Sequence, residues 1–419
     1  MSKYSIKSFD QILTFLVFII LVLLPAIEVI SRLFSSTGIV ASSVLVQHLT
    51  LWVGFLGAVI ASRRNNLLSL TTKPIFSSTE PIEWKNLVGK ITSIIIVLLL
   101  AYGSWLLVQI EIDFPVKIAP FISRWFALLI MPLGFLTIAY FMFFNSFKPW
   151  KQKIVVSIII VLIFLLFIYV EPIQESNIFM WIAILVLGLS LYVGAPIFIG
   201  LGGIAILFFW RDFTPLSAIS AETYRIVVSP TLPTIPLFTF AGYLLAESNA
   251  SSRLVNLFRS TFGWIPGGTP IILVLLCGFF TALTGGSGVT ILALGGLFMP
   301  ILIKEGYSRS FSLGLITVAG SLGLLFPPSL PLIIYGVTAG VSIKAILLAG
   351  IVPGLIRLSM IGGWAIWQGK VQLVKKTSLS LKEVKSSIWD AKWEAIIPLF
   401  ILFGIFGGYA TLVETAAIT

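Results

Sequence analysis

The sequence predicts an all-α polytopic membrane protein, and three observations support this fold class. Of the 419 residues, 58% are hydrophobic and only 10% are charged, which leaves too little polar surface to cover a water-facing exterior. Apolar runs about 20 residues long, the length of a membrane-spanning helix, recur along the whole chain. Lys and Arg gather in the short segments between these runs, where they set orientation. We therefore expect about 11 transmembrane spans plus one re-entrant helical hairpin.

Composition also excludes several other classes of protein. A formal charge of +11 would suit a nucleic-acid partner, but the basic residues are distributed as membrane-orientation signals, so we expect no nucleic acid. Cys277 is the only cysteine, which rules out an internal disulfide and a cysteine metal cluster. Lys3 and Lys7 precede an apolar run in the manner of a signal peptide. The run lacks a small-residue cleavage site and extends past Pro25, so a retained first helix is favoured.

The first 170 residues contain five apolar runs of spanning length. The connecting segments alternate between basic and neutral or slightly acidic, which places the N-terminus in the cytoplasm. We expect a four-helix membrane module over residues 1–150 and a connecting helix within 151–172. The expected spans are 11–34, 44–62, 88–110, 124–146 and 153–170.

The next apolar stretch, residues 178–210, is too long for one crossing. At about 1.5 Å per residue it would extend roughly 50 Å, against a hydrocarbon core of about 30 Å. Gly194-Ala195-Pro196 lies at its middle, so we expect two short crossings joined by a turn. A further crossing over 231–247 follows a segment rich in proline.

The stretch 269–303 has basic residues on both sides, Arg253 and Arg259 before it and Lys304 and Arg309 after it. Both ends therefore belong on the cytoplasmic side, and the stretch cannot cross the membrane once. It is best explained as a re-entrant hairpin whose tip is the glycine-rich residues 285–288.

A broken span over 311–338 and a returning span over 344–368 complete the unit 173–368, which begins outside and ends inside. Residues 369–392 are the most basic segment and are expected to form a cytoplasmic loop. A second copy of the unit would start inside and be inverted, as in many transporters. Only its first helix, in 393–419, is present, so the second repeat is expected to be largely absent.

The two breaks, at residues 285–288 and 323–328, are the strongest indication of a binding site. Irregular backbone inside hydrocarbon persists only when it is buried in protein or lines a wet cavity. Paired breaks of this kind mark the binding sites of secondary transporters. The alternative is two ordinary membrane helices that tolerate Gly and Pro.

These breaks supply oxygen ligands. The hairpin tip offers the hydroxyls of Thr284, Ser287 and Thr290, and the second break offers carbonyls that Pro327 and Pro328 keep out of helical pairing. Oxygen donors without thiolate or imidazole suit an alkali cation. The helix N-termini at the breaks carry partial positive charge suited to a carboxylate. The alternative for each hydroxyl is a hydrogen bond to its own helix backbone.

Two further patterns permit alternative interpretations. Residues 285–288 match the GxSG pattern of intramembrane serine proteases, whose serine needs a general base, and His48 is the only histidine. Glu28 and Arg32 are four residues apart on the first span, so they either pair on one helix face or extend to the outer interface.

The stretch 283–356, which begins LTGGSGVTILALGGLFMP, resembles the large membrane subunit of tripartite ATP-independent periplasmic (TRAP) transporters. Residues 229–238 resemble the family's SPxLxxIPLF segment, and the closing LVETAA resembles its TPTEAA motif. Residues 31–34 and 52–64 are similar to the small membrane subunit, and 153–170 would be the helix that fuses the two subunits. The resemblance therefore covers essentially the whole chain, with the large subunit truncated after its first repeat.

The resemblance implies sodium-driven uptake of small organic acids, such as dicarboxylates or sialic acids, handed over by a soluble periplasmic binding protein. It also implies an elevator motion in the bacterial inner membrane and no enzymatic activity. Further expected partners are membrane lipid and, if it is encoded separately, the missing second half of the large subunit. Carried onto matching positions, the sodium site would involve Thr284, Thr290, Gly323, Phe326 and Pro328. The candidate substrate-binding residues are Gly285, Gly286, Ser287 and Ser229.

Three other functions remain open from the sequence. A sodium–dicarboxylate symporter acting alone shares the inverted-repeat plan, although it has no evident use for a four-span N-terminal module. A transport-incompetent scaffold or assembly fragment fits an incomplete second repeat. An intramembrane serine protease would need His48 and Ser287 to meet.

Overall fold

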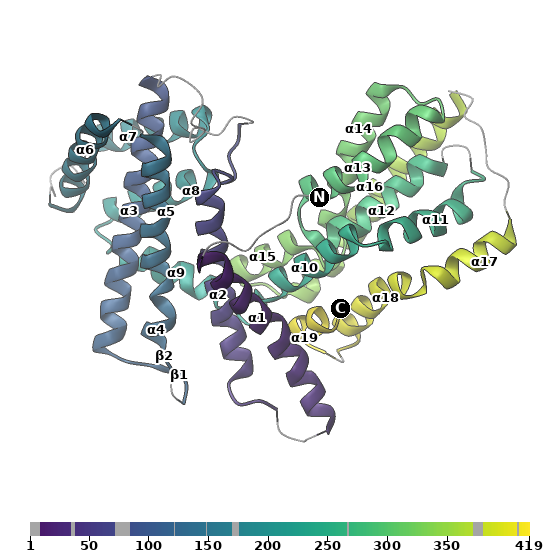
Figure 1. Cartoon of the computed structure of the whole chain (residues 1–419), viewed down its shortest axis with the longest axis horizontal. Helices are drawn as coiled ribbons and strands as arrows, with labels where there is room; N and C mark the ends of the chain where they lie inside the picture. Colours follow the sequence, from purple (N-terminus) through teal and green to yellow (C-terminus); the bar gives the residue numbers. More distant parts are fainter. Residues whose placement is uncertain are drawn as a thin grey trace. The chain divides into compact units, whose positions relative to one another are not determined.

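The chain divides into two compact units (Figure 1). The first comprises Met1–Leu21 and Ile39–Val228, and the second comprises Val22–Gly38 and Ser229–Thr419, so helix α1 (Phe9–Phe34) begins in one and ends in the other. The computed structural model describes residues 9–34, 38–71, 84–120, 122–147, 149–169, 176–265, 268–371, 380–408 and 410–419.

The first unit is a helical bundle centred on α3, which packs against α5, α6, α7, α8 and α9 (Figure 1). Apolar residues surround α3 on most sides, and Val97 and Leu99 are fully buried. Its helices are α2 (Ser42–Arg63), α3 (Trp84–Asp113), α4 (Arg124–Leu128), α5 (Ile130–Ser146), α6 (Trp150–Tyr169), α7 (Asn177–Val193), α8 (Ile197–Arg211) and α9 (Ser217–Val227).

Two local features of this unit concern the sequence predictions. The predicted turn within 178–210 is present, because α7 ends at Val193 and is followed by Gly194, whose φ of +112° only glycine adopts easily; that each helix crosses the membrane stays a prediction. The two helices then pack closely: a β-carbon added at Gly200 would lie 2.5 Å from Leu191 Cδ1. The segment after α3 contains an unpredicted antiparallel pair, β1 (Lys117–Ala119) and β2 (Ile122–Ser123).

The second unit is built around α12, whose residues Leu273, Leu276, Cys277 and Phe280 are all buried. Its neighbours include α10, α11, α13, α14 and α16. The helices are α10 (Thr234–Glu247), α11 (Ala250–Phe262), α12 (Gly268–Thr284), α13 (Ser287–Lys304), α14 (Arg309–Gly320), the 3₁₀ turn η2 (Leu322–Leu325), α15 (Leu330–Ala339), α16 (Ile343–Val371), α17 (Leu381–Asp390), α18 (Lys392–Gly407) and α19 (Leu412–Ile418).

Both predicted breaks are present in the structure. A two-residue link joins α12 to α13, and a bend of 43° separates the α14 and η2 segment from α15. The predicted basic loop is partly helical, because α17 occupies Leu381–Asp390 with Ser380 capping its first turn. The chain after α18 forms the additional short helix α19, whose Thr411 and Glu414 make a reciprocal capping box.

Length and composition support an all-α membrane protein. Five described helices are long and apolar enough to span a bilayer, or six if the bent pair counts as one span, and five shorter apolar helices accompany them. The predicted number of spans, the re-entrant placement of the hairpin and the cytoplasmic N-terminus therefore stay predictions. Several basic residues that carry the orientation argument, including Lys3 and Lys7, lie outside the described residues.

Candidate functional site

The hairpin between α12 and α13 turns at two glycines. Gly285 has a φ of +66°, and a β-carbon there would lie 2.5 Å from Leu330 Cδ1, so both its conformation and its packing require glycine. Its amide donates to the Thr281 carbonyl at 2.9 Å and closes the last turn of α12. Helix α10 packs against the same turn, since a β-carbon at Gly242 would lie 2.8 Å from Thr284 Cγ2. The tip is therefore held from two sides.

Three threonine hydroxyls and one carbonyl meet beside this tip. Thr281 Oγ1 lies 2.9 Å from Thr290 Oγ1 and 2.9 Å from the Gly320 carbonyl oxygen. Thr284 Oγ1 lies 3.3 Å from Thr290 Oγ1. All three threonines are buried, with exposed fractions of 0%, 7% and 1% for Thr281, Thr284 and Thr290. We call Thr281, Thr284, Thr290 and the Gly320 carbonyl the oxygen cluster.

The geometry of the helices explains why these atoms converge. Thr281 and Thr284 are three residues apart and share a face at the end of α12, and Thr290 lies in the first turn of α13. Gly320 ends α14, and a β-carbon there would lie 2.9 Å from Ile291 Cδ1, so glycine permits α14 to approach the hairpin. The cluster thus lies where the two arms of the hairpin meet the C-terminal end of α14, close to both chain breaks.

The predicted sodium ligands separate into two groups. Thr284 and Thr290 belong to the oxygen cluster. Gly323 packs on α12, where a β-carbon would lie 2.6 Å from Thr281 Cβ, but its carbonyl accepts the Phe326 amide at 3.2 Å. The Phe326 carbonyl accepts the Ser329 amide at 2.9 Å. The carbonyls at this break therefore form local turns, although each retains a second lone pair.

Phe326 and Pro328 line an apolar hollow instead of the oxygen cluster. This cavity has a volume of about 300 Å³. Gly278 and Ala282 of α12 lie on its wall, and Ala282 directly follows Thr281, so its side chain is turned by about 100° from that of Thr281. The hollow and the oxygen cluster therefore occupy different sides of α12. Its lining residues are Leu275, Gly278, Phe279, Ala282, Leu283, Phe326, Pro327, Pro328, Ile351, Leu358, Pro398, Ile401 and Leu402.

The predicted substrate-binding residues lie in two places, at the hairpin tip and in the segment before α10. Gly286 accepts the Thr290 amide at 3.3 Å, and half-buried Ser287 begins α13, whose N-terminus has no side-chain cap. This leaves first-turn amides of α13 available to an anion. Ser229 lies before α10, and its buried hydroxyl has no hydrogen-bond partner among the described residues. No described contact joins Ser229 to the hairpin.

Two residues of this region were not among the predicted ligands. Thr281 is the most central hydroxyl, and its spacing of three from Thr284 is the sequence signal that could have identified it. Arg357, in the middle of α16, donates to the Ser321 carbonyl at 3.3 Å and to Ser321 Oγ at 2.6 Å. A charged residue inside an apolar run is itself a reason to suspect function.

His48 lies in the first unit with both ring nitrogens bonded. Nδ1 lies 2.7 Å from the Val44 carbonyl oxygen and Nε2 lies 2.8 Å from the Tyr224 hydroxyl. A general base needs a free nitrogen that faces its nucleophile. The structure therefore offers no support for the protease interpretation.

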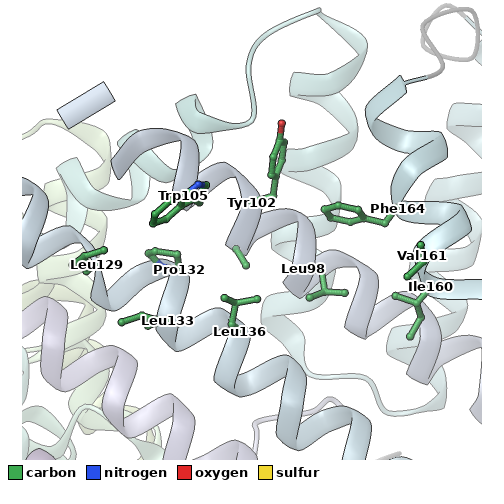
Figure 2. A pocket seen from close by; sticks show the side chains of 11 residues that line it. Leu98, Tyr102, Trp105, Leu129, Pro132, Leu133, Leu136, Ile160, Val161 and Phe164 are labelled. Carbon is green, nitrogen blue, oxygen red and sulfur yellow. The ribbon is translucent and has the colours of Figure 1, made fainter. Parts of the chain in front are cut away.

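The first unit also contains an apolar hollow of about 380 Å³ between α3, α5 and α6 (Figure 2). Tyr102 and Trp105 carry the only side-chain polar atoms of its lining, and Figure 2 shows the Tyr102 hydroxyl pointing away from the leucines. Such a lining suits hydrocarbon and not an organic acid, which needs convergent polar groups.

Comparison with known families gives two matches in one chain. The family model "Tripartite ATP-independent periplasmic transporter, DctM component" matches residues 179–419. The model "Tripartite ATP-independent periplasmic transporters, DctQ component" matches residues 21–152. The oxygen cluster lies within the DctM match.

Curated relatives agree with this assignment. The chain is 34% identical over 233 residues to the isethionate TRAP transporter permease protein DctMQ of Oleidesulfovibrio alaskensis, which covers 55% of this chain and 37% of the relative. It is 34% identical over 238 residues to the C4-dicarboxylate TRAP transporter large permease protein DctM of Vibrio cholerae, and this match covers 56% of this chain and 52% of the relative. It is 32% identical to the ectoine TRAP transporter large permease protein TeaC of Halomonas elongata, covering 54% of each.

The chain thus spans about half the length, or less, of these curated relatives. The DctM match nevertheless covers more than half of the chain itself, and the DctQ match precedes it. The chain therefore belongs to the DctM-component family of the tripartite ATP-independent periplasmic transporters and carries a DctQ-component region in the same polypeptide.

Proposed function

We propose that the chain is the membrane permease component of a sodium-driven, binding-protein-dependent transporter that imports small organic acids by an elevator mechanism. The oxygen cluster is the observation that carries this proposal. Buried hydroxyls from both arms of a hairpin meet a carbonyl at the C-terminal end of α14, and helix C-terminal ends of this kind coordinate coupling ions in many transporters.

The donor set fits sodium. All four groups are neutral oxygens, and the described residues contain no group of three or more His, Cys, Asp or Glu side chains that could hold a metal ion. Neutral hydroxyl and carbonyl oxygens suit a hard alkali cation better than a transition metal. Thr281, Thr284, Thr290 and Gly320 would hold the ion, while Phe326 and Pro328 would support the break from the apolar side.

A small organic anion is the proposed substrate class. Relatives are named for transport of C4-dicarboxylates, isethionate and ectoine. The N-terminus of α13, at Gly286 and Ser287, would receive a carboxylate because its amides and helix dipole favour negative charge. Gly285 would hold the tip in the conformation that presents these amides, because its φ of +66° and its packing against Leu330 require glycine.

The proposed assembly follows from the family. A periplasmic substrate-binding protein would deliver the anion, the chain would lie in the bacterial inner membrane with a cytoplasmic N-terminus, and membrane lipid would surround it. The proposed division is a small-subunit-like module over 1–150, a connecting helix within 151–172, a first repeat over 173–368, a basic segment over 369–392 and the start of a second repeat over 393–419. Further large-subunit sequence would complete the inverted repeat.

Sodium binding can be tested on the chain itself. We expect the melting temperature of the purified protein to rise in sodium chloride relative to potassium chloride at equal ionic strength. A ligand at about 100 times its Kd adds about 2.7 kcal/mol to stability. Thr290→Val should abolish the sodium effect, whereas Thr317→Val, which removes a hydroxyl bonded only to its own helix at the Leu313 carbonyl, should retain it. An equal response of both variants would contradict the assignment of the ion to the oxygen cluster.

Transport requires a second test. Proteoliposomes that contain the permease should take up labelled C4-dicarboxylate, isethionate or another small organic acid only with an inward sodium gradient and a cognate periplasmic substrate-binding protein. Uptake that proceeds equally without the binding protein would favour a symporter acting alone. Sodium binding without any uptake would favour a scaffold role.

A further inference from the structure

Helix α9 presents one stripe of residues to α2 and α3 in the first unit. Leu216 directly precedes α9 in a helical conformation, and Leu216, Ser220 and Tyr224 are spaced four residues apart, so they share one face. Each of them contacts a different residue across the interface, and the three contacts differ in kind.

The first contact is a close approach of backbones. A β-carbon added at Gly103 of α3 would lie 2.6 Å from the Leu216 carbonyl oxygen. No real side chain tolerates that distance to a backbone atom, so glycine at position 103 allows α9 to lie directly against α3.

The second contact is a pair of buried serines. Ser104 Oγ and Ser220 Oγ are 3.1 Å apart, with exposed fractions of 1% and 2%. Ser104 already donates its single proton to the Leu100 carbonyl at 2.7 Å. Because a carbonyl can only accept, Ser220 is the donor to Ser104.

The third contact is the hydrogen bond between His48 and Tyr224, and its direction is also fixed by a neighbouring backbone carbonyl. His48 Nδ1 faces the Val44 carbonyl at 2.7 Å and must donate to it, so the Nε2 of a neutral imidazole is an acceptor. The Tyr224 hydroxyl, 2.8 Å away, therefore donates to Nε2. His48 is only 5% exposed, so either partner would be left unsatisfied if the other were displaced.

These contacts join the two family regions. His48, Gly103 and Ser104 lie in the DctQ match, and Leu216, Ser220 and Tyr224 lie in the DctM match. We propose that this six-residue surface fixes the register in which the DctM region docks on the DctQ region, beside the packing of α7 and α8 on α3 and the covalent connection through α6. The close approach brings the helices together, and the two polar bonds set their register, since a slide of α9 by one turn would break both. This proposal does not depend on sodium or substrate.

Disulfide trapping tests the docking geometry in the full chain. The double substitution Ser104→Cys with Ser220→Cys should form a cross-link under mild oxidation, detected by mass spectrometry as linked peptides that carry positions 104 and 220. Cys277 is buried and remains in every variant. The matched control is Ser93→Cys with Ser220→Cys, because Ser93 is a buried serine of α3 that bonds the Gly89 carbonyl about three turns away. No cross-link at 104 and 220, or equal cross-linking of the control, would overturn the proposal.

A double-mutant cycle tests the energetic role. His48→Phe and Tyr224→Phe should each lower the melting temperature, because each leaves one buried polar atom without a partner. The double substitution should recover most of the larger single loss, since it removes both polar atoms together. Thr50→Val, which removes a buried hydroxyl of the same helix bonded to the Val46 carbonyl, provides the control for lost hydroxyls within α2. Strictly additive losses would show that the His48–Tyr224 bond does not join the two regions and would overturn the proposal.

Discussion

Replacement of Gly323 by alanine should destabilise the second unit and disrupt the oxygen cluster. A β-carbon at Gly323 would lie 2.5 Å from the Ala282 amide nitrogen and 2.6 Å from Thr281 Cβ. Both atoms belong to α12, the central helix of the unit, so neither can move without displacement of the core. The turn η2 must therefore shift away from α12, which would separate the Gly320 carbonyl from Thr281 Oγ1, now 2.9 Å apart.

The magnitude follows from these contacts. Overpacking of a closely packed site costs about 1–3 kcal/mol. For a unit of this size, each 1 kcal/mol corresponds to about 2–4 °C in melting temperature, so Gly323→Ala should lower it by roughly 2–12 °C. Gly314→Ala is the matched control, because Gly314 lies on α14 with no atom within 4 Å of its added β-carbon. Alanine in an open helical position should be neutral or stabilise by about 0.5–1 kcal/mol.

Thermal unfolding of the purified protein in detergent measures both variants, in sodium and in potassium chloride. We expect a lower melting temperature in Gly323→Ala, an unchanged or higher one in Gly314→Ala, and a loss of the sodium response in Gly323→Ala only. If Gly323→Ala were as stable as the parent, or if Gly314→Ala were destabilised as much, the inferred contact between η2 and α12 would be refuted.

Three further predictions concern charged groups. Burial raises the pKa of Glu305, although the Thr269 hydroxyl at 2.8 Å and Arg259 partly oppose this effect. Because the folded-state pKa is raised, the contribution of Glu305 to stability falls as pH rises above about 4.3, the ordinary pKa of a glutamate. The melting temperature of Glu305→Gln should therefore rise relative to that of the parent between about pH 4 and pH 7. A constant difference between the two melting temperatures would contradict this prediction. Arg253 forms an ion pair with Glu394, whose side chain is only 7% exposed, so Arg253→Leu should cost roughly 1–3 kcal/mol in denaturant unfolding. Arg225→Leu breaks the exposed ion pair with Glu222 and should not change the free energy of unfolding measurably. If Arg225→Leu and Arg253→Leu were equally destabilising, burial would not be what makes the Arg253–Glu394 pair important. Burial raises the pKa of Glu414, but the Thr411 amide and hydroxyl and Arg32 outweigh it and lower that pKa below its ordinary value. The stabilisation that ionised Glu414 provides should therefore be lost as pH falls below about 4.3, the ordinary pKa of a glutamate. The melting temperature of Glu414→Gln should consequently fall less on acidification than that of the parent.

The fold class and most element boundaries could be predicted from the sequence because their causes are local. Long apolar runs form helices wherever the solvent is hydrocarbon, and the breaks at Gly194, Gly285 and residues 323–328 occur where glycine or proline interrupts such a run. The pairing of Glu28 with Arg32 also follows from their spacing of four, and the structure contains this ion pair. The structure adds Glu414 as a second partner of Arg32, which spacing along one helix could not reveal.

The composition of the oxygen cluster was decided by tertiary packing. Oxygen atoms at both breaks were evident from residue types, but the direction in which each atom points depends on the rotation of its helix against its neighbours. Neighbouring residues on a helix differ by about 100° in direction, so Ala282 faces the apolar hollow while Thr281 faces the cluster. Phe326 and Pro328, in the link between η2 and α15, also line the hollow. The sequence alone therefore determined where the chain breaks and what chemistry the breaks can offer, whereas packing decided which oxygens meet, because that requires contacts between helices distant in sequence.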